Sequence, residues 1–191
     1  MLPQISRLLI RSILLGSLLL FGCGSAPVLV SKNAAVPVGV DLSGFWQVRD
    51  DPVAKRLVAA GNGGEQLIPV SRKQRVQERS SKGVSAQVFL EFGESLKITQ
   101  TYFGLFISYD RSVVEEYVYG ENRLVTVGPI EAARVSGWDG RSFVVETLDD
   151  SGATLFETWH LEDGGSVLIR DIRISKGESD SFNHQQVFDL K

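Results

Sequence analysis

The chain has 191 residues, a formal net charge of −3 and 23% charged residues, which is the size and composition of one globular domain. This mild acidity excludes a general electrostatic attraction to nucleic acid, so we expect no nucleic-acid partner. A single cysteine excludes an internal disulfide and zinc sites built on cysteine pairs. That cysteine, Cys23, must have another use.

Residues 1–22 have the features of a secretory signal, because Arg7 and Arg11 precede a short apolar run. The run, 12–20, is too short to remain as a membrane-spanning helix, which needs about 20 residues. It leads into a tetrapeptide that resembles the lipobox of bacterial lipoproteins, Leu20-Phe21-Gly22-Cys23. The resemblance implies cleavage before Cys23, attachment of diacylglycerol to its thiol and acylation of the new amino terminus, with palmitate as a typical chain.

The residues after Cys23 indicate the destination and the organisation of the mature chain. Gly24 and Ser25 follow, and the absence of aspartate there implies, by the same resemblance, an outer-membrane anchor facing the periplasm. Residues 24–40 mix Ser, Ala, Pro and Val without a period, as tethers do. We expect a signal peptide over 1–22, a lipidated tether over 23–40 and one β-domain over 41–191. The alternative is an ordinary signal with an incidental cysteine.

One short N-terminal helix is predicted. Asp51 is a typical N-cap, Pro52 suits the first helical position, and Gly61 ends the apolar face, which gives a helix from Pro52 to Ala60. The glycine-rich stretch 61–64 lacks the ending of a phosphate-binding loop and is interpreted as a connector.

From Val84 onward, apolar and polar residues alternate with a period of two, which predicts strands with one buried face. The first predicted strand is 84–92, and short turns separate the later ones up to Ile174; Asp139-Gly140 is the strongest hairpin signal. The links are too short for crossover helices. We therefore predict an all-β fold, an antiparallel up-and-down meander that closes into a barrel and so protects its edges; a sandwich is the alternative.

A second resemblance agrees with the barrel. Gly44-Phe45-Trp46 resembles the Gly-x-Trp opening of lipocalins and lipocalin-like bacterial domains, and 138–147 with 157–161 look like their hairpins. The Thr-Asp-Tyr motif of animal lipocalins is absent, so the resemblance is to the broad bacterial group. It implies that Trp46 closes one end of the barrel against an arginine of the last strand, Arg173 or Arg170. An ordinary core aromatic is the alternative.

Aromatic residues on neighbouring predicted strands are candidates for lining a pocket for a small apolar ligand. They are Phe103, Phe106, Tyr117 and Tyr119, and ordinary core packing explains them equally well. The basic segment 71–82 carries five positive charges against one negative. It fits phosphate head groups or peptidoglycan carboxylates, and a solvated loop or a charged edge strand is the alternative.

No catalytic motif is present. The chain has no Gly-x-Ser-x-Gly elbow, and Glu157 and His160 fall on opposite faces of one predicted strand, so they form no metal pair. We expect no enzyme activity, cofactor or metal site. The resulting hypothesis is a membrane-anchored envelope lipoprotein whose barrel binds a small apolar ligand. The alternative is a structural or interaction module of the bacterial envelope.

Overall fold

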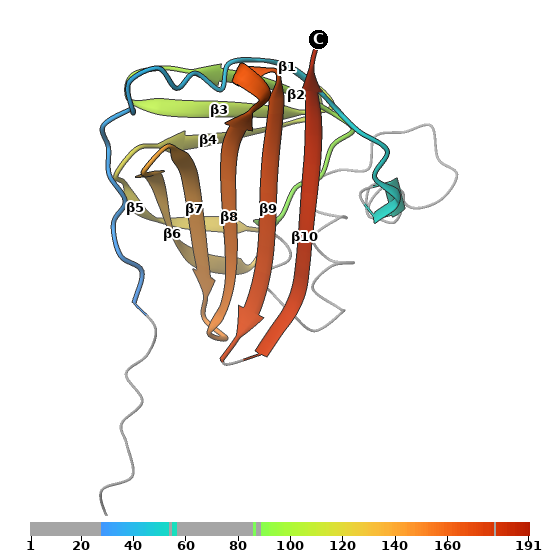
Figure 1. The fold of residues 1–191 in the computed structure, drawn as a ribbon. Coiled ribbons are helices and arrows are strands. Elements are labelled where there is room, and N and C mark those ends of the chain that lie inside the picture. The colour runs from blue at the N-terminus through green and yellow to red at the C-terminus, as the bar shows by residue number, and fades with distance from the viewer. Residues whose placement is uncertain (1–27, 54, 57–85, 87–88, 178) are drawn as a thin grey trace, which may run out of the picture.

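The structure is a computed structural model that describes residues 28–53, 55, 56, 86, 89–177 and 179–191. Within these residues, ten strands form one antiparallel sheet that curls around a common interior (Figure 1). A short 3-10 turn, η2 (Asp163–Gly165), joins the eighth and ninth strands. The strands are β1 (Gly44–Val48), β2 (Ser95–Gln100), β3 (Gly104–Tyr109), β4 (Val113–Val118), β5 (Asn122–Val127), β6 (Ile130–Asp139), β7 (Ser142–Asp149), β8 (Ala153–Glu162), β9 (Val167–Lys176) and β10 (Ser179–Leu190).

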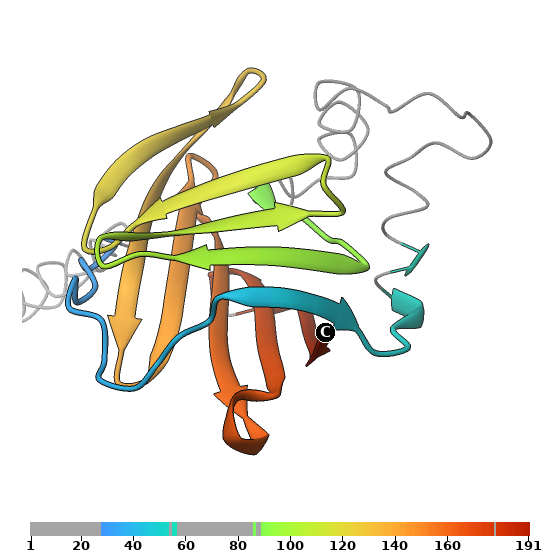
Figure 2. The same cartoon turned by 90° about the horizontal axis from the view of Figure 1, so that it is seen from above.

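The strand order is β4-β3-β2-β1-β10-β9-β8-β7-β6-β5, so consecutive strands pair and β1 returns to pair with β10. This confirms the predicted all-β, antiparallel up-and-down meander. The hydrogen-bond ladder is interrupted at one place, between the edge strands β4 and β5. In Figures 1 and 2, β2–β4 run across the direction of β7–β10, which makes the curled sheet a half-barrel.

Tight turns hold the meander in register. The predicted Asp139-Gly140 hairpin is confirmed: Asp139 pairs with Ser142, and Gly140 has a φ of 57°. At the β3–β4 turn, three residues separate the paired Tyr109 and Val113, and two of them, Asp110 and Arg111, have positive φ. The Asp110 carboxylate accepts a hydrogen bond from the Ser95 amide at 2.7 Å and so ties this turn to the start of β2.

The prediction of a strand over 84–92 is wrong for the residues that the structure describes. Residues 86 and 89 have helical-turn geometry, and 90–92 have no regular structure. Ala86, Phe89, Leu90, Glu91 and Phe92 are all buried, whereas a strand with one buried face would expose alternate residues. The segment packs inside the barrel, where it has neighbours on several sides.

The predicted helix begins as expected. The Asp51 carboxylate accepts from the Val53 amide at 3.0 Å, and the Lys55 amide donates to the Asp51 carbonyl at 3.0 Å. Residues 52, 53, 55 and 56 are helical, and the rest of the predicted helix and the connector 61–64 lie outside the described residues. No helix in the described part of the chain is long and apolar enough to span a membrane.

The segment before β1 lies against the barrel from residue 32 on. The Lys32 ammonium pairs with Glu146 at 3.0 Å, and Asn33 exchanges backbone hydrogen bonds with Trp138. Gly137 permits this approach, because a Cβ there would lie 2.5 Å from the Asn33 carbonyl oxygen. The latter half of the predicted tether is therefore packed on β6, and Val40 enters the core.

Two apolar clusters fill the interior. The first gathers around Trp46, Tyr109, Trp138, Phe143 and Trp159. The second contains the buried residues described between 86 and 92, here called the inward segment. Its other members come from β5, β6, β8 and β9: Val127, Ala132, Ala153, Leu155, Ile172 and Ile174. A group of charged side chains lies between the two clusters and forms the candidate site.

Candidate functional site

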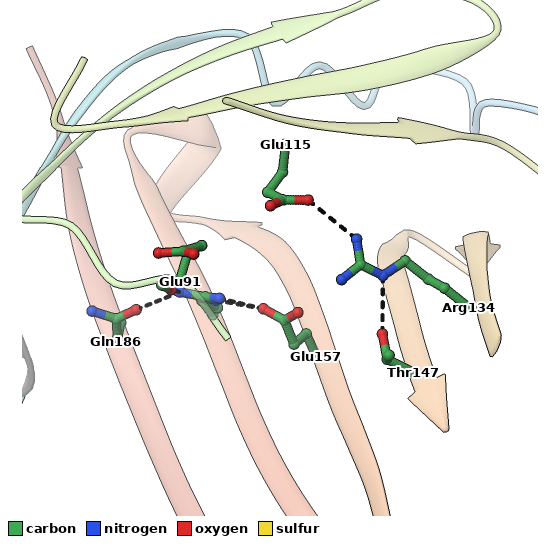
Figure 3. Close-up of polar contacts among 7 residues, drawn as sticks. Glu91, Glu115, Arg134, Thr147, Glu157 and Gln186 are labelled. Carbon is green, nitrogen blue, oxygen red and sulfur yellow. Dashed lines mark hydrogen bonds and ion pairs between the residues drawn. The ribbon is translucent and has the colours of Figure 1, made fainter. Parts of the chain in front are cut away.

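Figure 3 shows the polar centre of the barrel, a group of seven buried side chains from β4 and β6–β10 and from the inward segment. A barrel interior is normally apolar, and a buried charge is costly unless it is paired. This centre therefore has a structural or binding role that ordinary core packing does not explain. Its members are Glu91, Glu115, Arg134, Thr147, Glu157, Arg170 and Gln186.

Arg170 on β9 makes the larger half of the polar centre. Its Nε and Nη2 both donate to Oε1 of Glu157, the former at 2.9 Å, and its Nη1 donates to Gln186 Oε1 at 2.9 Å and the Glu91 carbonyl at 2.8 Å. Burial alone would lower the pKa of Arg170, but Glu157 raises it, and the net direction is upward. Arg170 therefore stays charged.

Aromatic rings cover the Arg170 guanidinium on several sides. Its central carbon lies 4.5 Å from the ring centre of Trp159 and 5.5 Å from that of Tyr109, both in the first apolar cluster. Phe92 of the second cluster lies at 5.7 Å. These cation-π contacts fix the group between the two clusters.

Arg134 on β6 makes the other half. Its Nη1 donates to Glu115 on β4 at 3.2 Å, and its Nε donates to the Thr147 hydroxyl at 3.0 Å. The guanidinium lies between the rings of Tyr117 and Phe89, at 5.5 and 5.7 Å. Because β4 is an edge strand, the ion pair ties the two sides of the sheet together across its interruption.

Several buried donors have no hydrogen-bond partner among the described residues: Tyr109 Oη, Tyr119 Oη, Trp138 Nε1 and Trp159 Nε1. Burial raises the pKa of both tyrosines, so their hydroxyls remain protonated and able to donate at neutral pH. An unpartnered buried donor costs about 1–3 kcal/mol. All four donors belong to the first apolar cluster.

The structure places the expected barrel-closing residues apart. Trp46 is 2% exposed, and its Nε1 donates to the Leu42 carbonyl at 3.0 Å. Arg173 instead lies on the outer face of β9 with its guanidinium 5.2 Å from the Phe156 ring centre, and Arg170 stacks on Trp159. The predicted contact between Trp46 and an arginine is absent among the contacts of the described residues: Arg173 faces outward, and Arg170 pairs with Gln186, four residues along β10 from Leu190, the partner of Trp46.

Of the candidate ligand-lining residues, the two tyrosines lie in the interior and the two phenylalanines do not. Tyr117 and Tyr119 are buried in the interior, where both pack edge-on against Phe143. Phe103 is 47% exposed at the β2–β3 turn, and Phe106 lies on the outer, half-buried side of β3. The expectation that Phe103 and Phe106 line the interior is therefore wrong, because the inward positions of β3 are those of Leu105, Ile107 and Tyr109.

The sequence interpretation missed the polar centre, although one signal was available. Glu115 and Glu157 share the apolar faces of their strands with Tyr117 and Trp159, which is the pattern of a buried charge. A buried carboxylate needs a partner, and that requirement points to inward arginines. Cys23 and the basic segment 71–82 lie outside the described residues.

Two pockets lined by described residues lie on the outer faces of the sheet. One, of about 430 Å³, crosses β8–β10 at Phe156, Asp171 and Arg173. The other, of about 320 Å³, lies over β1–β3 at Phe45, Lys97 and Arg111.

His184 pairs with Asp51 at 2.8 Å, and no group of three metal-ligating side chains lies together in the part of the chain that the structure covers.

No family model and no curated protein matches the chain. Solved structures that are similar include an abundant heat soluble (SAHS) protein of Ramazzottius varieornatus, at 12% identity and a TM-score of 0.47, and lipid binding protein 8 of Caenorhabditis elegans, at 10% and 0.47. Both comparisons cover 78% of this chain and 94% of the other. A luciferase domain of the dinoflagellate Lingulodinium polyedrum has 13% identity and a TM-score of 0.45, covering 97% of this chain and 61% of that one.

Proposed function

We propose that the barrel binds a small, largely apolar molecule in its interior, and that a lipid on Cys23 anchors the chain in the bacterial envelope. The observation that supports binding is the set of buried, unpartnered donors in the first apolar cluster, beside the polar centre. Ligand sites are usually apolar with a few polar groups that fix orientation, which is the composition found here. The proposed role is binding and not catalysis.

An interaction module of the envelope is the second candidate. Large rings fill much of the described interior, since Trp46, Tyr109, Phe143, Trp159 and Phe188 are almost fully buried. A barrel of about eight strands has an interior just wide enough either for its own side chains or for one small ligand. The two functions therefore differ in whether the interior takes up a molecule.

Uptake of a neutral apolar probe separates the two functions. We expect the full chain carrying Cys23→Ala, which removes the acyl chains that would compete, to take up aminoanthracene saturably, as followed by fluorescence. Ala132→Phe adds bulk inside the second cluster and should reduce uptake, whereas Ala133→Phe, the next residue on β6, is a matched control that should leave it unchanged. Unsaturable uptake, or equal effects of both variants, would favour the interaction module.

The anchor has its own test. Cys23→Ala is expected to abolish labelling by palmitate and to release the protein from membranes, because the thiol is the proposed site of diacylglycerol attachment and the acyl chains supply the binding energy. Ser25→Ala should keep both properties. Flotation of membranes after metabolic labelling measures the two together, and a gradient separation of inner and outer membranes tests the proposed outer-membrane location. Membrane retention of Cys23→Ala contradicts the anchor.

A further inference from the structure

The charge of the polar centre limits the head group that it can receive. Each of the two buried guanidiniums is already paired with a buried glutamate, Arg170 with Glu157 and Arg134 with Glu115. A third carboxylate, that of Glu91, is buried beside them. A ligand carboxylate in this place would meet no unpaired arginine among the described residues and would add a negative charge next to Glu157.

The paired arginines need no further anion, whereas the unpartnered donors beside Arg170 need a hydrogen-bond acceptor. Tyr109 Oη and Trp159 Nε1 belong to rings that contact the same Arg170 guanidinium, and neither has an acceptor in the described chain. Both groups are neutral hydrogen-bond donors. They need an acceptor, and an uncharged oxygen satisfies them without disturbing the paired arginine.

We propose that the interior ligand carries an uncharged acceptor head group, such as an ester, a ketone or an alcohol, which Tyr109 and Trp159 bind, and that the site discriminates against free fatty acids. This inference rests on the proposed ligand-binding function and specifies its substrate class. The apolar part of the ligand would lie against the two clusters on either side of Arg170. Glu157 then determines specificity, because it neutralises the guanidinium that would otherwise attract a carboxylate.

Competition among three probes with one hydrocarbon chain tests the head group. Methyl dodecanoate, dodecanoate and dodecane compete with aminoanthracene for the full chain carrying Cys23→Ala at mildly alkaline pH. We expect the ester to bind about ten-fold more tightly than the ionised acid, because an unpaired buried charge is costly. The ester should also bind better than dodecane, which offers no acceptor.

Two substitutions assign the effect to the named residues. Tyr109→Phe removes one donor and should weaken the ester about five-fold while leaving dodecane unchanged. Tyr102→Phe makes the same chemical change at a side chain that is 85% exposed and should alter neither. Glu157→Gln keeps an oxygen facing Arg170 but removes its charge, and should raise the affinity of dodecanoate relative to the ester about ten-fold.

The outcomes separate the proposed head-group preference from the proposed ligand-binding function. Equal binding of all three probes, or a Tyr109→Phe variant that binds the ester as well as before, would mean that water satisfies the donors; the inference then fails while the binding function stands. Tight binding of dodecanoate by the unmodified site also overturns it. If none of the probes competes and aminoanthracene is not taken up, the binding function itself fails. Should Glu157→Gln not fold, the Tyr109→Phe comparison decides alone.

Discussion

Arg170→Met is expected to lower the free energy of unfolding by about 3–5 kcal/mol, the usual loss when one partner of a buried ion pair is removed. The substitution leaves Glu157 buried without its cation and deprives Gln186 and the Glu91 carbonyl of their donor. It also removes the group that holds the rings of Trp159 and Tyr109. Equilibrium unfolding in urea, followed by tryptophan fluorescence, measures the loss.

The same strand supplies the control for Arg170. Arg173→Met makes an identical change on the outer face of β9 and should alter stability by no more than about 0.5 kcal/mol. The double variant Arg170→Met/Glu157→Met should recover part of the loss, because a buried pair replaced by apolar groups of similar volume is often neutral. A loss of under about 1 kcal/mol for Arg170→Met alone would show that the pair is not buried as described.

Trp46→Ala is expected to cost about 3–5 kcal/mol, because it leaves a large cavity in the first apolar cluster. It also removes the hydrogen bond from the indole to the Leu42 carbonyl, which holds the segment before β1. Thermal and urea unfolding measure the change, and Trp46→Phe should lose less because part of the volume is kept.

Phe45→Ala is the matched control for Trp46. Phe45 is the preceding residue on β1, faces outward and is 53% exposed, so its removal should change stability by about 0.5 kcal/mol or less. Equal losses for the two variants would contradict the assignment of Trp46 to the interior. The comparison needs no assumption about a ligand or an anchor.

The alternation of apolar and polar residues predicts most of the strands, but it does not predict which segment packs inside the barrel. Alternation and turn residues were enough to place β2–β9, because each turn is local and a strand reports its buried face in every second residue. The same logic fails at 84–92, where Phe89, Leu90 and Phe92 are buried together. A segment that lies inside the barrel has no single buried face. Alternation of apolar and polar residues along it therefore does not show which of its residues are buried.

The candidate site was harder to predict because it depends on pairing between strands. Alternation places Glu157 with Leu155 and Trp159, but only the β8–β9 register brings Trp159 opposite Arg170. The run Val167-Leu168-Ile169 is apolar on both faces, so the sequence alone does not decide which way Arg170 points. Arg134 and Glu115 lie on strands that share no ladder, and no local pattern links them.

The attachment of residues 32 and 33 to β6 and β7 shortens the free chain between the proposed anchor and the barrel. An extended chain spans roughly 3.3–3.6 Å per residue. From Cys23 to Asn33, the first residue that bonds to β6, the reach is therefore at most about 35 Å, against about 60 Å had the whole segment to Val40 been free. A lipid on Cys23 would keep the barrel close to the bilayer surface, with the Trp138 side of β6 nearest the point of attachment. Partners of the anchored barrel would then have to come to the membrane.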